Sequence, residues 1–98
     1  MLSGKQKKSL RSAANQLRPS VMIGKEGITP ALIEFLEEAF NTRELVKLRV
    51  LDTCPLDIKA VAGQIAEMNN SELIQILGRT FLLFRPHPDK SVNSGNEN

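Results

Sequence analysis

The sequence predicts a single compact α/β domain in which three helices pack with one mixed sheet of four strands. Three observations favour this fold. Segments with helical periodicity alternate with short apolar segments that suit strands. A turn that contains glycine joins the last two apolar segments. The chain of 98 residues is long enough for only one hydrophobic core. We therefore expect the order α-β-α-β-α-β-β over residues 1–85. Residues 86–98 have no core-forming pattern, and we expect them to form a disordered polar tail.

The first helix is predicted from residue 4 to about residue 17. Ser3 is followed three residues later by Gln6, which is the spacing of a capping box at a helix start. Pro19 ends the helix, because the residue before a proline avoids the α conformation. Each residue of a helix is rotated by roughly 100° from the one before it, and this places a set of mostly apolar side chains along one side of the helix. We expect this stripe to pack on the body of the domain. The set is Gln6, Leu10, Ala13, Ala14 and Leu17.

A short strand and a second helix follow. The apolar run of residues 21–23 suits a buried strand. Thr29 and Pro30 have the residue types of an N-cap and a first helical position, so a helix is expected from residue 30 to about residue 40. Its buried side chains should be Leu36, Phe40 and either Leu32 or Ile33. Its acidic side chains, Glu34, Glu37 and Glu38, are expected to be only solvated.

Residues 44–51 alternate between apolar and polar side chains, which predicts a strand. One face would be wet and basic, with Lys47 and Arg49, and the other would carry Val46, Leu48 and Val50. A third helix is expected to start at Thr53 and Pro55 and to end near residue 69. Its inward side chains should be Ile58, Val61, Ala62 and Ile65. Residues 73–77 and 81–84 are predicted as two strands of a hairpin that turns around Gly78 and Arg79.

Basic side chains are concentrated at the N-terminal end of the chain. Residues 1–25 contain six Lys and Arg and no acid, whereas the other 73 residues contain seven basic and eleven acidic side chains. This asymmetry indicates that one end faces a polyanion, although a solvated helix face would give the same pattern. On the first helix, three basic side chains lie together beside the apolar stripe, and we call this group the basic arc. A fourth joins them if the helix extends that far, and a fifth lies further around the helix. In this order they are Lys7, Lys8 and Arg11, then Arg18, then Lys5.

Residues 24–27, Gly24-Lys25-Glu26-Gly27, form a Gly-x-x-Gly loop between the first strand and the second helix. Glycine lets a backbone approach a phosphate closely, the following helix start favours an anion, and Lys25 adds a cation. By spacing alone a tight turn is the default explanation, and the pattern fits neither a P-loop nor a dinucleotide fingerprint. Since only residues 18–23 separate the loop from the basic arc, we expect both to follow one RNA backbone. Glu26 should repel phosphate unless Lys25 or Arg18 pairs with it.

The side chains of catalytic and metal sites are scarce in this sequence. Cys54 has no second cysteine for a disulfide or a metal cluster, and His87 has no potential ligands beside it. No Ser/His/Asp set and no pair of carboxylates with a shared cleft is evident, so we expect neither an enzyme nor a cofactor. The lone cysteine, together with the lack of an apolar N-terminal run or membrane span, favours a cytoplasmic protein.

Several short motifs occur in order between residues 2 and 85. They are Leu2-Ser3-Gly4-Lys5-Gln6-Lys7, Leu10-Arg11, Leu17-Arg18-Pro19, Ile23-Gly24-Lys25-Glu26-Gly27-Ile28-Thr29, Glu44-Leu45-Val46-Lys47, Gly78-Arg79-Thr80 and Leu83-Phe84-Arg85. As an ordered set they resemble the CRM domain (chloroplast RNA splicing and ribosome maturation), and specifically its stand-alone bacterial YhbY form. The resemblance implies a fold similar to the C-terminal domain of bacterial translation initiation factor three. It also implies RNA binding and association with precursors of the large ribosomal subunit.

We therefore predict a non-enzymatic, monomeric protein that binds ribosomal RNA or pre-large-subunit particles and has no membrane or small-molecule partner. With four Phe and no Trp or Tyr, specificity should come from RNA shape and not from base stacking. An adaptor that docks an acidic protein on the basic helix is the alternative. The predicted RNA-binding residues are Lys5, Lys7, Lys8, Arg11, Arg18, Gly24, Lys25, Glu26, Gly27, Lys47 and Arg49.

Overall fold

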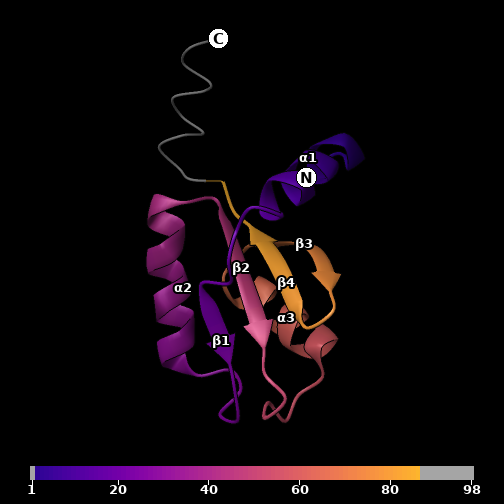
Figure 1. Cartoon of the computed structure of the whole chain (residues 1–98). Coiled ribbons are helices and arrows are strands. Elements are labelled where there is room, and N and C mark those ends of the chain that lie inside the picture. The colour runs from indigo at the N-terminus through magenta and orange to yellow at the C-terminus, as the bar shows by residue number, and fades with distance from the viewer. Residues whose placement is uncertain (1, 87–98) are drawn as a thin grey trace.

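A computed structural model describes residues 2–86, and within them the elements occur in the predicted order. The strands form one sheet in the order β1-β2-β4-β3, in which β1 is parallel to β2 and the other neighbours are antiparallel. The predicted mixed sheet with three helices is therefore confirmed (Figure 1). The predicted polar tail lies outside the described residues except for Pro86. The elements are α1 (Gly4–Ala14), β1 (Val21–Ile23), α2 (Pro30–Thr42), β2 (Leu45–Val50), α3 (Ile58–Met68), β3 (Glu72–Leu77) and β4 (Thr80–Phe84).

The sheet has a helix layer on each face, and the two layers differ in extent. Helices α2 and α3 pack on one face, where alternate strand residues meet them in the main core. The side chains of this core include Leu36, Phe40, Val61, Ile65, Val46, Leu48, Val50, Phe81 and Leu83. Helix α1 packs on the other face and covers only the end where β2 begins and β4 ends (Figure 1). There Leu10 and Ala14 meet Leu45, Leu82 and Phe84. Within residues 2–86, no helix lies over the rest of this face.

Helix α1 begins as predicted and ends three residues early, at Ala14. The capping box is present, since the Gln6 amide donates to Ser3 Oγ at 3.1 Å and the Ser3 amide donates to Gln6 Oε1 at 2.8 Å. After Ala14 the backbone tightens, with the amides of residues 15, 16 and 17 donating to carbonyls three residues earlier. The chain has to leave the helix before Pro19 to enter β1, and this tight turn makes the exit.

The inward face of α1 differs from the predicted stripe. Ala14 is buried and Leu10 is half-buried, as expected, but Gln6, Ala13 and Leu17 are exposed. Lys7 and Arg11 are half-buried instead. The helix is therefore rotated toward its basic arc, and in this position Lys7 Nζ pairs with Glu72 Oε2 of β3 at 3.2 Å.

Helix α3 starts later than predicted. Its N-cap is Asp57, whose Oδ2 accepts a hydrogen bond from the Lys59 amide at 3.0 Å, and its first residue is Ile58. The expected start at Thr53 and Pro55 was wrong because the chain first has to turn away from β2, which it does through residues 51–57. Within that turn the Cys54 amide donates to the Leu51 carbonyl at 3.0 Å. The inward side chains of α3 are those predicted, together with Ala66.

The hairpin between β3 and β4 confirms the predicted turn. Gly78 has a φ of +62°, a left-handed conformation that favours glycine. Next to it, the Arg79 side chain donates to the carbonyls of Val50 at 3.0 Å and Leu51 at 2.9 Å. Arg79 thereby joins the hairpin turn to the end of β2.

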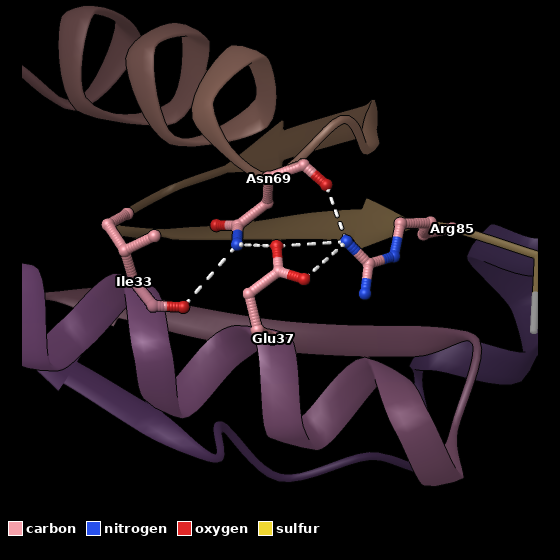
Figure 2. A network of polar contacts seen from close by, with 4 residues as sticks. All are labelled: Ile33, Glu37, Asn69 and Arg85. Atoms are coloured by element: carbon pink, nitrogen blue, oxygen red, sulfur yellow. Dashed lines mark hydrogen bonds and ion pairs between the residues drawn. The ribbon is translucent and has the colours of Figure 1, made fainter.

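A polar network holds together α2, the end of α3 and the chain after β4 (Figure 2). Glu37 of α2 accepts hydrogen bonds from Arg85 at 2.9 and 3.1 Å and from Asn69 Nδ2 at 2.7 Å. Asn69 is buried and is the C-cap of α3. The expectation that Glu37 is only solvated was therefore wrong, because the fold brings Arg85 to it from 48 residues away in the sequence.

Candidate nucleic-acid interface

Three basic residues surround the segment that links α1 to β1, residues 15–20, which we call the linker. Arg18 belongs to the linker and is exposed. Lys47 of β2 donates from Nζ to the Leu17 carbonyl at 3.4 Å, and Arg43, after α2, donates from Nη1 to Ser20 Oγ at 3.4 Å. Two cations from one segment of the chain, Arg43 and Lys47, thus contact the linker that carries Arg18. We call Arg18, Arg43 and Lys47 the linker cluster.

Arg43 was not among the residues predicted from the sequence. It lies in the connection between α2 and β2, where no periodicity shows the direction of a side chain. The only signal was its charge at a boundary between two elements. Its place beside the linker follows from the parallel pairing of β1 with β2, which the sequence alone did not give.

The basic side chains of α1 are not equivalent. Lys5 and Lys8 are exposed, whereas Lys7 and Arg11 are half-buried beside the sheet. The ion pair between Lys7 and Glu72 offsets the charge of Lys7. The cations of α1 that face solvent without such a partner in the described part of the chain are therefore Lys5 and Lys8.

The uncovered part of the sheet extends the basic surface from the linker cluster. Arg49 is exposed on the same face of β2 as Lys47. Its neighbour on β1 is Met22, which is 56% exposed, and its neighbour on β4 is Thr80. The predicted strand of residues 21–23 thus has two buried side chains and an exposed one, because α1 does not reach this far along the sheet. Figure 1 shows this open face between α1 and the loops at the opposite end of the sheet.

The Gly-x-x-Gly loop forms a tight turn at that opposite end. The Gly27 amide donates to the Gly24 carbonyl at 3.0 Å, and Gly27 has a φ of +64°, so the turn itself requires Gly27. Gly24 has no such φ. Its Cα lies against the next loop, and a Cβ added there would meet Thr53 Oγ1 at 3.4 Å. Lys25 and Glu26 are both exposed, and in the described residues no hydrogen bond or ion pair joins Glu26 to Lys25 or Arg18.

The start of α2 offers fewer donors to an anion than the sequence indicated. Pro30 has no amide proton, the Leu32 amide donates to the N-cap Thr29 Oγ1 at 3.1 Å, and the Ile33 amide donates to the Thr29 carbonyl at 3.1 Å. A phosphate at this end would therefore rely on Lys25 and on loop amides more than on the helix start.

The structure does not bring the loop next to α1. The loop follows the C-terminal end of β1, whereas α1 lies at the other end of the sheet (Figure 1). The expected proximity was wrong because β1 (Val21–Ile23) runs along the sheet away from the linker, and the six residues 18–23 can span up to about 20 Å. Lys47 and Arg49 lie along the strand that connects the two ends, so they occupy the gap that a bound chain would cross.

Features of other site types are few in the described residues. Across residues 2–86, no group of three or more His, Cys, Asp and Glu side chains lies together where a metal ion would bind. None of the helices described is long and apolar enough to cross a membrane. Cys54 is a free, half-buried thiol. His87 lies outside the described residues.

A single α/β domain with exposed lysines on one helix, exposed arginines beside the linker and Arg49 on the adjoining sheet face has the charge distribution of a nucleic-acid-binding protein. A family model described as the CRS1 / YhbY (CRM) domain matches residues 2–85. The chain belongs to this family, as the sequence motifs indicated.

Relatives and a solved structure agree with this assignment. The chain is 40% identical to Probable RNA-binding protein YqeI of Bacillus subtilis over 85 residues, covering 87% of this chain and 88% of the relative. It is 30% identical to a protein named RNA-binding protein of Haemophilus influenzae, covering 93% and 92% of the two chains. The solution structure of the hypothetical protein SAV1595 from Staphylococcus aureus is similar, with a TM-score of 0.74, 38% identity and coverage of 88% and 90%.

Proposed function

We propose that this protein binds the RNA of large-ribosomal-subunit precursors in the cytoplasm, as a monomer without catalytic activity, and assists their assembly. The observation that carries the proposal is the basic surface that runs from α1 through the linker cluster to Arg49. The positive charge of this surface favours a polyanion as the ligand. The relatives are named RNA-binding proteins, which supports RNA as that polyanion. The resemblance of the sequence motifs to the CRM domain supports the ribosomal precursor as the target.

The proposed binding mode starts at the helix and ends at the loop. RNA phosphates contact the exposed cations of α1 and the linker cluster, the backbone then crosses the open sheet beside Arg49, and a further phosphate meets Lys25 and the Gly-x-x-Gly loop. Since phosphates dominate such contacts, affinity should depend steeply on salt. If about five phosphates are neutralised on a single strand, log affinity falls with log salt at a slope near −3.5.

A charge-removal variant tests the surface. Replacing Arg18 and Arg43 by Gln removes two cations of the linker cluster and leaves the core untouched, because both side chains are exposed. The variant should bind single-stranded RNA more weakly and with a shallower salt slope. Lys59→Gln, on α3 at the opposite face of the sheet, is the matched control and should behave like the unaltered protein. Equal affinities for all three proteins would contradict the proposed surface.

The identity of the RNA needs a separate measurement. Crosslinking in cells, followed by sequencing of the attached RNA, should recover ribosomal precursor from the unaltered protein and much less from the Arg18→Gln, Arg43→Gln variant. Recovery of mostly messenger RNA would overturn the ribosomal assignment and leave RNA binding in place. Little RNA of any kind, with an acidic protein crosslinked instead, would favour the adaptor predicted as the alternative.

A further inference from the structure

An apolar groove of about 400 Å³ lies between α1 and the junction of α2 with β2. Its size falls within the roughly 300–1,000 Å³ of small-ligand sites. One wall is formed by α1 and the other by the start of β2 and the end of β4. The side chains that line it include Leu10, Ala13, Leu17, Leu45, Phe84 and Arg43.

The apolar wall of this groove consists largely of the stripe that the sequence predicted to be buried. Ala13 is exposed because α1 is rotated toward Lys7, and Leu17 is 38% exposed in the tight turn that follows the end of the helix at Ala14. Opposite them, Phe84 is half-buried. Apolar surface that packing leaves open in this way is a feature of ligand-binding grooves.

The mouth of the groove is cationic. Arg43 lines the groove itself, Arg18 follows Leu17 in the chain, and Lys47 donates to the Leu17 carbonyl at 3.4 Å. The linker cluster is therefore the immediate neighbour of an apolar cavity. A ligand that fits both features has a flat apolar part and a negative charge attached to it.

We propose that this groove receives one unpaired base of the bound RNA while the linker cluster holds the phosphates on either side of it. The inference rests on the proposed function, since it assumes that RNA occupies the basic surface. A nucleotide joins an apolar face to a phosphate, which is the combination that the groove and its mouth present. Thr42 and Glu44 also line the groove, so part of its lining is polar.

This arrangement selects unpaired over paired RNA. In a duplex the bases stack inside the helix and cannot enter a groove, whereas a bulge or loop base can be splayed out. The scarcity of aromatic residues predicted recognition by shape alone. Phe84 beside α1 gives the protein a place to recognise one base as well.

Two substitutions alter the groove and leave every basic residue in place: one fills the groove and the other removes part of its apolar wall. Ala13→Leu adds a side chain at an exposed helix position that lines the groove, and Leu17→Ser removes part of the apolar wall. Ser12→Leu is the matched control, because Ser12 is an exposed residue of α1 outside the groove lining and receives the same side chain. Circular dichroism verifies that all three proteins are folded.

The probe is an RNA hairpin with one bulged 2-aminopurine, compared with the same hairpin fully paired. The unaltered protein and Ser12→Leu should bind the bulged hairpin about tenfold more tightly, and the fluorescence of the bulged base should change on binding. Ala13→Leu and Leu17→Ser should bind both hairpins alike, at the affinity of the paired one. That result supports the proposal.

Other results overturn it. A bulge preference that survives Ala13→Leu, or that occurs without a fluorescence change, means that the protein recognises the shape of the RNA and not a base in the groove. A dimer in sedimentation experiments that Ala13→Leu converts to monomer means that a second copy of the chain occupies the groove. If neither hairpin binds in a salt-dependent way, the proposed RNA-binding function fails together with this inference.

Discussion

Arg85 donates from a single nitrogen, Nη1, to both carboxylate oxygens of Glu37, at 2.9 and 3.1 Å (Figure 2). The same nitrogen donates to the Asn69 carbonyl at 2.7 Å, and the guanidinium lies 4.7 Å from the centre of the Phe40 ring. Arg85 thereby connects the chain after β4 with α2 and with the end of α3. Arg85 belongs to a motif that the sequence shares with the CRM family, and its contacts give it a structural role.

Replacing Glu37 by Gln should make folding stability less dependent on pH. The hydrogen bond from Arg85, with that from Asn69, lowers the pKa of Glu37 below its ordinary value. A lowered pKa adds stability above the ordinary pKa of a glutamate, and this stability disappears as the pH falls through the lowered pKa. At pH 7 the variant should lose less than about 1 kcal/mol, because the Glu37 side chain is 47% exposed. Urea unfolding between about pH 7 and pH 3 should show the difference shrinking below about pH 4.3.

The neighbouring glutamate provides the control for this experiment. Glu38 is exposed on the same helix and forms no ion pair with any residue that the structure describes. Glu38→Gln should unfold with nearly the pH dependence of the unaltered protein. Stability curves for Glu37→Gln and the unaltered protein that run parallel down to pH 3 would show that the ion pair contributes nothing.

The two glycines of the Gly-x-x-Gly loop should respond differently to substitution. Gly27→Ala places a side chain at a φ of +64° and should cost about 1 kcal/mol of folding stability. Gly24→Ala should fold almost normally, since its Cβ would make ordinary contacts with Thr53 Oγ1 at 3.4 Å and Leu51 Cδ1 at 3.6 Å. If the loop backbone grips a phosphate, Gly24→Ala nevertheless weakens RNA binding, because its methyl group keeps the phosphate away.

Thermal unfolding and RNA titration of the two variants separate these effects. Gly63→Ala is the control for an added methyl group, because Gly63 is an exposed residue of α3 with nothing within 4 Å of its added Cβ. It should raise stability by about 0.5–1 kcal/mol and leave RNA binding as it is. Full RNA affinity in Gly24→Ala would remove the loop from the proposed interface.

Arg79→Lys should destabilise the fold without weakening RNA binding. Arg79 donates through two nitrogens to the carbonyls of Val50 and Leu51, and an ammonium group cannot reach both in the same geometry. The loss should be about 1 kcal/mol in urea unfolding. The ion pair with Asp52 matters little, because Asp52 is 93% exposed, so Asp52→Asn should change stability by less than about 0.5 kcal/mol. Weaker RNA binding by folded Arg79→Lys would instead place Arg79 in the interface.

The order of the elements and the main core could be predicted because they depend on local patterns. Alternation in β2 and the spacing of Leu36 and Phe40 in α2 report burial directly, and capping residues mark helix starts. The start of α3 shows the limit of this reasoning. Thr53 and Asp57 are both suitable N-caps, and only the path of the chain away from β2 decides between them.

The candidate interface was predictable in its charge and not in its layout. The sequence identified Arg18, Lys47 and the loop, but Arg43 joins them only through the pairing of β1 with β2. The rotation of α1 likewise depends on packing against Leu45, Leu82 and Phe84, which lie far along the chain. Contacts between distant segments set these positions, and no periodicity along one segment carries that information.

The pair Lys7 and Lys8 gives a direct test of that rotation. Both are cations of α1, but Lys7 pairs with Glu72 at 3.2 Å and is half-buried, whereas Lys8 is exposed. Lys8→Gln should therefore weaken RNA binding and reduce the magnitude of the salt slope by about 0.7–0.9. Lys7→Gln should have a smaller effect, because the RNA competes with Glu72 for this charge.

Replacing Glu72, the ion-pair partner of Lys7, should strengthen RNA binding instead of weakening it. Glu72→Gln removes an acid from beneath α1 and releases the Lys7 ammonium, so RNA affinity should rise and the salt slope should steepen. Fluorescence anisotropy with one single-stranded RNA, at several salt concentrations, measures all three variants on one scale. The ion pair is weak because both side chains are partly solvated, so folding stability should change by less than about 1 kcal/mol. If Glu72→Gln lowers the affinity, or if Lys7→Gln weakens binding as much as Lys8→Gln, then Glu72 does not restrain Lys7 in the RNA complex.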